Sequence, residues 1–161
     1  PKVKIGEDAA FTYPCLLAAE SLAYVDGCLY HYRNNAQSMT AAFDPHLTET
    51  IFIPLDILRT YFDTDKRALF AQYQMYAAYL LQLWVRNQAS LDCDLDRKRM
   101  RQSCARVCQN QELRALLASV PGALPRQVAV AVRAVQQQKP GQLYMLIKAW
   151  NLYYKLRNGR A

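Results

Sequence analysis

Two acidic residues near the start of the chain are the first candidates for chemistry. Glu7 and Asp8 follow Gly6 and precede an apolar stretch with helical periodicity. Glycine tolerates the backbone angles of a tight turn, and acids in a first helical turn are stabilised by free N–H groups and the helix dipole. A carboxylate held in this way can act as a general base if it faces a pocket. Simple capping of the helix is the alternative interpretation.

A second group of polar side chains belongs to an aromatic-rich stretch and the polar turn after it: His31, Tyr32, Arg33, Ser38 and Thr40. The Arg33 guanidinium has the planar fork that matches phosphate oxygens. His31 either faces the same site or is an ordinary strand residue, and the sequence leaves both alternatives open.

Residues 6 to 40 present these features in a fixed order: Gly6-Glu7-Asp8, a helix-like run, a short strand, Tyr30-x-Tyr32-Arg33 and Ser38-x-Thr40. This order resembles the C-terminal end of family 2 glycosyltransferases, which have the GT-A fold. The resemblance covers about residues 3 to 40, roughly a quarter of the chain. It implies inverting transfer of a sugar from a nucleotide-diphosphate donor to an acceptor hydroxyl, as in the synthesis of cell-surface polysaccharides or glycoconjugates.

The resemblance also implies roles for individual residues. Asp8 matches the catalytic base and Glu7 its acidic neighbour, while Arg33 is the best local candidate for holding the diphosphate. His31, Tyr32, Ser38 and Thr40 are candidates for the rim that binds donor or acceptor.

In full-length enzymes of this family, a divalent metal, Mg or Mn, usually helps to neutralise the charge on the leaving diphosphate. The family's nucleotide-binding strands and its Asp-x-Asp motif are missing from these 161 residues. We therefore expect the chain alone to hold no metal, to bind donor poorly and not to turn over. The acidic run from Asp92 to Asp96 matches that motif only in its letters, since the family's motif lies in the upstream half.

The patterns predict a mainly α protein in two parts. Residues 1–43 are expected to be the end of a GT-A α/β domain, with a hairpin that turns at Asp26-Gly27. Residues 44–161 are expected to form a helical bundle. Short strands are predicted at 1–5, 22–25 and 28–33. Hydrophobic periodicity predicts helices over 8–21, 44–62, 66–89, 96–109, 111–118, 125–138 and 142–157, with a kink at Pro54.

Charge is distributed unevenly along the chain. Residues 1–96 contain 7 basic and 12 acidic side chains, whereas residues 97–161 contain 13 basic side chains and a single acidic one. Such a basic half suits an anionic partner, which could be acidic lipid, nucleic acid or an acidic domain, or it is only a solvated face. Nucleic acid is the weakest of these, because no helix-turn-helix, zinc-finger or RNA-module pattern occurs.

The last predicted helix supports an alternative function, a non-enzymatic module that docks on a membrane surface or on a partner protein. One of its faces carries Leu143, Leu146, Ile147, Trp150 and Tyr154, and further apolar residues widen that face: Met145, Leu152, Tyr153 and Leu156. With Lys148, Lys155 and Arg157 it could lie on an anionic membrane surface or pack on the bundle.

The five cysteines, Cys15, Cys28, Cys93, Cys104 and Cys108, follow no disulfide framework. Reduced thiols and a cytoplasmic location are the simplest expectation, with peripheral docking at the inner face of the membrane as an open alternative. A zinc site is discounted because no Cys-x-x-Cys pair occurs. Neither a signal peptide nor a transmembrane helix is expected.

Overall fold

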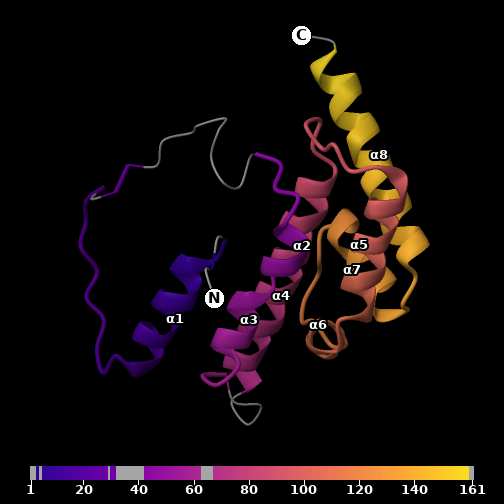
Figure 1. Ribbon diagram of the computed structural model, residues 1–161. Coiled ribbons are helices and arrows are strands. Elements are labelled where there is room, and N and C mark those ends of the chain that lie inside the picture. The colour runs from indigo at the N-terminus through magenta and orange to yellow at the C-terminus, as the bar shows by residue number, and fades with distance from the viewer. Residues whose placement is uncertain (1–2, 4, 29, 32–41, 63–66, 160–161) are drawn as a thin grey trace.

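The computed structural model describes residues 3, 5–28, 30–31, 42–62 and 67–159. These residues form helices joined by turns and coil, and they include no β-strand (Figure 1). The mainly α prediction is therefore confirmed. The helices, in chain order, are α1 Glu7–Ala18, α2 Leu47–Thr50, α3 Ile53–Leu58, α4 Arg67–Gln88, α5 Arg97–Gln109, α6 Gln111–Leu117, α7 Arg126–Gln136 and α8 Pro140–Asn158.

Helix α4 is the centre of the molecule and contacts α3, α6, α7 and α8. Its inward stripe includes Tyr73, Leu80 and Trp84, each no more than 2% exposed. The indole N–H of Trp84 donates to the Thr48 hydroxyl at 3.0 Å, which joins α4 to α2. These side chains share one side of the helix because residues three, four and seven positions apart lie on the same face.

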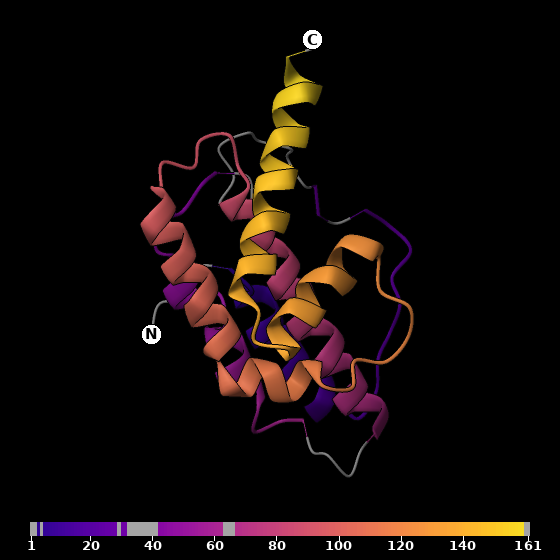
Figure 2. The ribbon, with the colours of Figure 1, turned by 90° about the vertical axis from the view of Figure 1, so that its right-hand side faces the viewer.

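Helices α5, α7 and α8 pack against one another beside α4. Figure 2 shows α8 lying along α5 and α7, with its C-terminal end extending beyond the other helices. Leu143 and Ile147 anchor α8, since they are 0% and 1% exposed. No helix among the residues described is both long and apolar enough to cross a membrane.

Two prolines begin helices rather than interrupt them. The helix expected over 44–62 is two short helices, α2 and α3, and Pro54 lies in the first turn of α3. The last helix, predicted to start at residue 142, begins at Pro140, and the turn before it contains Gln138 with φ 52°. Proline is tolerated in a first turn, where its missing N–H would have no helical partner.

The predicted N-terminal strands are not formed in the part of the chain that the structure describes. Residues 19–28 and 30–31 are coil and bends. Leu22, Tyr24 and Val25 are 76%, 90% and 63% exposed. An isolated two-stranded hairpin is marginal in water, and these side chains have no third strand or helix to cover them. The hairpin prediction, and with it the α/β remnant, is therefore wrong for these residues.

Helix α1 joins the rest of the molecule through α3 and an aromatic cluster. The Tyr13 ring meets the edges of Phe62 and Tyr76, with centroids 5.9 Å apart in each pair. Phe62 in turn stacks on Tyr73 at 5.1 Å. No residue of α1 is fully buried, so this aromatic contact is what positions the acids at its start.

Candidate functional site

Gly6 determines where α1 begins. Its φ of 86° and ψ of 17° are left-handed, and its carbonyl accepts the first helical hydrogen bond from the Ala10 N–H at 2.9 Å. A Cβ at this position would collide with the Tyr76 hydroxyl and lie 3.1 Å from Cγ of Pro54. Glycine is thus required both by the backbone angle and by the close approach of α3 and α4.

Glu7 and Asp8 occupy the first turn of α1, and both are exposed. One Asp8 carboxylate oxygen accepts a hydrogen bond from the Ala9 N–H at 2.8 Å. A carboxylate here is held near the positive end of the helix dipole while it remains accessible to a ligand. Asp8 is therefore placed where a general base could act, and the same position is one where an acid simply stabilises the helix.

The Tyr76 hydroxyl lies beneath this turn. The residue is 8% exposed, and its hydroxyl oxygen has no hydrogen-bond partner among the described residues. Burial, followed by the nearby charge of Asp8, raises the pKa of Tyr76. Periodicity placed Tyr76 in the core, but no local signal could show that its hydroxyl ends under Gly6, 70 positions earlier.

Of the remaining predicted site residues, the structure describes His31. Tyr32, Arg33, Ser38 and Thr40 fall outside the described residues. His31 is exposed in coil, and within the described residues no polar contact joins it to Glu7 or Asp8. Among the predicted site residues that the structure describes, Glu7 and Asp8 lie next to each other in the first turn of α1.

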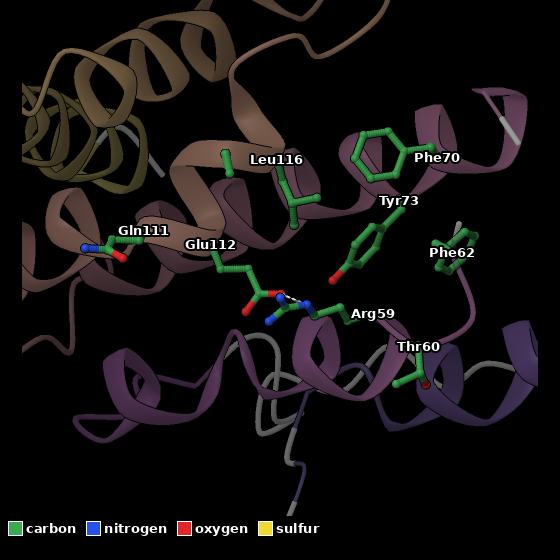
Figure 3. A pocket seen from close by; sticks show the side chains of 9 residues that line it. Arg59, Thr60, Phe62, Phe70, Tyr73, Gln111, Glu112 and Leu116 are labelled. Atoms are coloured by element: carbon green, nitrogen blue, oxygen red, sulfur yellow. Dashed lines mark ion pairs between the residues drawn. The ribbon is translucent and has the colours of Figure 1, made fainter. Parts of the chain in front are cut away.

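A separate cleft of about 760 Å³ opens between α3, α4 and α6 (Figure 3). Figure 3 shows the side chains of Arg59 and Glu112 pointing toward each other, with aromatic rings beside them. The lining residues are Arg59, Thr60, Phe62, Phe70, Tyr73, Gln111, Glu112, Ala115 and Leu116.

The polar wall of this cleft contains the Glu112 carboxyl group beside the Arg59 guanidinium. Arg59 Nε lies 3.8 Å from Glu112 Oε1. Burial raises the pKa of Glu112, and a hydrogen bond and the charge of Asp56 raise it further, whereas Arg59 opposes the shift. The Tyr73 O–H donates to the Leu55 carbonyl at 2.6 Å. The cleft can exchange hydrogen bonds with a polar ligand, and sequence reasoning missed it because its residues come from three separate helices.

The described residues do not fit the divalent metal that the family resemblance implies. Among them, no group of three or more His, Cys, Asp or Glu side chains is placed to hold a metal ion. Cys104 and Cys108, four residues apart on α5, are buried, and the Cys108 thiol donates to the Ala134 carbonyl at 3.8 Å. Both thiols are part of the core of the bundle.

No protein-family model, no curated protein and no solved structure matches this chain. The resemblance of residues 3–40 to glycosyltransferases therefore depends on those residues alone.

Proposed function

We propose that this chain supplies the acceptor side of an inverting glycosyltransferase, which uses a nucleotide-diphosphate sugar and an acceptor hydroxyl in cell-surface polysaccharide or glycoconjugate synthesis. The observation that carries the proposal is the placement of Asp8. It is exposed in the first turn of a helix whose start is held by the left-handed Gly6. Accessibility and a fixed direction are what a general base requires.

In the proposed reaction, the Asp8 carboxylate removes the proton from the acceptor hydroxyl. The hydroxyl oxygen attacks the anomeric carbon from the face opposite the diphosphate, and the carbon–oxygen bond to the diphosphate breaks with its electron pair. The products are an inverted glycoside, a nucleoside diphosphate and a protonated Asp8. Arg33 would stabilise the charge on the leaving diphosphate.

Glu7 would orient Asp8 or the acceptor, and four further side chains would line the donor and acceptor rim: His31, Tyr32, Ser38 and Thr40. The site also requires a nucleotide-binding half. Large apolar side chains of α1 and the following coil are available to contact such a half, because Phe11, Leu22 and Tyr24 are between 73% and 90% exposed. We propose a cytoplasmic location for the reaction.

The test is sugar transfer by a protein in which this chain is joined to its nucleotide-binding half. Asp8→Asn should lower kcat by about a hundredfold to ten-thousandfold, because the acceptor proton loses its base. Circular dichroism should remain unchanged, since Asp8 is exposed. Glu20→Gln, an exposed acid beyond the end of α1, is the matched control and should transfer sugar normally.

Near-normal turnover of Asp8→Asn would remove Asp8 from the mechanism. Failure of the joined protein to bind any nucleotide sugar would remove the function itself. The 161-residue chain alone should show no transfer.

A further inference from the structure

Helix α8 has one face that is packed on the bundle. Leu143 and Ile147 are buried, and the side chains of Trp150 and Tyr154 are partly buried against the same core. The Asn151 amide also donates to the backbone carbonyls of Ala89 and Ser90, at 3.2 and 3.1 Å. The packed face and its orientation are therefore well defined.

The opposite face carries a second apolar stripe, which we call the outer stripe and which consists of Met145, Ala149, Leu152 and Leu156. The spacing of four, three and four residues places these side chains in one line on a helix, roughly opposite Leu143 and Ile147. Met145, Leu152 and Leu156 are 64%, 57% and 57% exposed, and Ala149 is exposed as well. Tyr153, 56% exposed, widens the stripe. Figure 2 shows the C-terminal half of α8 extending away from the bundle.

The charges that α8 itself contributes beside the outer stripe are all positive. Lys148 and Lys155 lie along one edge and Arg157 lies on the other side, and all three are exposed. Pro140–Asn158 contains no acidic residue. The acidic run from Asp92 to Asp96 follows the Ala89–Ser90 backbone that Asn151 binds, and Asp92 lines a hollow with Tyr154 and Asn158 of α8. Lys148 also lies close enough to Cys93 to lower the pKa of that thiol against the larger effect of burial, so the run reaches the Lys148 side of the helix as well.

Neighbouring helices extend this positive border. The exposed Arg101 of α5 places its guanidinium 5.4 Å from the centre of the Tyr144 ring of α8. Arg97 and Lys98 are exposed one turn earlier on α5. An anionic surface that met the outer stripe would therefore meet several cations on the same side of the molecule.

We propose that the outer stripe of α8 docks on the surface of a membrane that contains anionic lipids, with the helix lying parallel to the surface. The apolar side chains would enter the boundary between headgroups and acyl chains, and the bordering cations would contact lipid phosphates. A second copy of this chain fits less well, because two α8 helices would face each other with only positive borders. The inference is independent of the proposed glycosyl transfer.

The test is co-sedimentation of the 161-residue chain with two kinds of vesicle, phosphatidylcholine alone and an equal mixture with phosphatidylglycerol. The chain should bind the mixed vesicles, and binding should weaken at about 0.5 M salt. Leu152→Ser with Leu156→Ser should reduce the partition coefficient by more than about tenfold. Lys148→Gln with Lys155→Gln should reduce it by about 25-fold, at about fivefold for each charge.

Each pair of substitutions has a matched control. Leu16→Ser with Leu22→Ser removes two leucines that are exposed near the N-terminus, 45% and 76%. Arg59→Gln with Arg106→Gln removes the same charge from ion pairs with Glu112 and Glu49. Both controls should bind the mixed vesicles nearly as well as the unmodified chain. All substituted side chains are exposed, so circular dichroism should show an intact bundle.

Absence of vesicle binding, equal binding to both kinds of vesicle, or unchanged binding of the two α8 variants would overturn the proposal. Sedimentation equilibrium tests the alternative that a second copy of this chain covers the outer stripe. A dimer that Leu152→Ser with Leu156→Ser converts to a monomer, without lipid binding, would make the stripe a self-association surface and would also overturn the proposal.

Discussion

A single backbone conformation decides how the acids at the start of α1 are presented. Gly6 adopts a φ of 86°, and the chain can approach α4 there only because residue 6 has no Cβ. The same close approach leaves the Tyr76 hydroxyl buried with no partner among the described residues. A buried hydroxyl without a hydrogen bond costs about 1–3 kcal/mol, so this contact carries an energetic cost at the position where Asp8 is oriented.

This geometry predicts coupling between Gly6 and Tyr76. Tyr76→Phe should raise the free energy of unfolding by about 1 kcal/mol, because it removes the unpartnered hydroxyl. Gly6→Ala should lower the free energy of unfolding by at least about 1–2 kcal/mol, because a left-handed φ is unfavourable for alanine. In the Tyr76→Phe background the cost of Gly6→Ala should be smaller by more than about 0.5 kcal/mol. Urea unfolding of the unmodified chain, the two single variants and the double variant measures this cycle. If the two changes in the free energy of unfolding simply add, Gly6 and Tyr76 do not touch.

At the level of the elements, side chains at the end of α3 meet the start of α6 where Asp56 and Arg59 approach Glu112. This approach brings Glu112 close to Asp56 while Arg59 lies 3.8 Å from the Glu112 carboxylate. Two carboxyl groups near one guanidinium leave one negative charge uncompensated. Burial and Asp56 therefore outweigh Arg59, and the pKa of Glu112 lies above its ordinary value of 4.5.

The raised pKa of Glu112 predicts a pH-dependent contribution to stability. When pH rises above about 4.5, the unfolded chain loses this proton before the folded chain does, so the free energy of unfolding falls as pH rises through the folded pKa. Glu112→Gln cannot titrate. As pH rises from 4 to about 7, Glu112→Gln should therefore become more stable relative to the unmodified chain, as measured by the free energy of unfolding.

Chemical unfolding at several pH values measures this difference, with the exposed Glu20→Gln as control. A difference for Glu112→Gln that stays constant across the pH range would mean that Glu112 titrates alike in the folded and unfolded chains.

At the scale of the whole molecule, burial separates the chain into a core and an exposed N-terminal segment. Most of the buried residues lie between α2 and α8, including Cys104 and Cys108 on α5, and Ile5 joins the same core from the start of the chain. Cys15 and Cys28 are exposed on α1 and on the coil after it. Burial raises the pKa of Cys104 to about 12 and that of Cys108 to about 11. Both core thiols are therefore protonated at neutral pH as well as inaccessible.

This separation predicts a labelling pattern for the five thiols. With Ellman's reagent at pH 8, Cys15 and Cys28 should react first, and the partly buried Cys93 should react later because burial raises its pKa. Cys104 and Cys108 should react only after denaturant is added. Mass spectrometry after timed alkylation identifies each site. Rapid labelling of Cys104 or Cys108 in the native chain would contradict the bundle described above.

The sequence by itself determined most of the helices, because helical periodicity and caps are local properties. Residues 66–89 were predicted as a helix and α4 spans Arg67–Gln88. Helix α5, predicted over 96–109, begins behind a local cap, since one Asp96 carboxylate oxygen accepts a hydrogen bond from the Arg99 N–H at 2.8 Å. The position of Glu7 and Asp8 at the start of a helix likewise followed from Gly6 and the apolar run after them.

Which of these local patterns found a packing partner depended on the three-dimensional fold. The short apolar run at residues 22–25 indicated a strand, yet a strand forms only where another strand pairs with it, and the described residues supply none. Helix α8 carries apolar side chains on two opposite faces. One of these faces packs against α5 and α7, and the outer stripe on the other face remains exposed. The contacts of Gly6 with Tyr76 and of Glu112 with Asp56 join residues that are far apart in the chain. Side-chain periodicity repeats over a few residues, so it cannot specify which distant helices will meet.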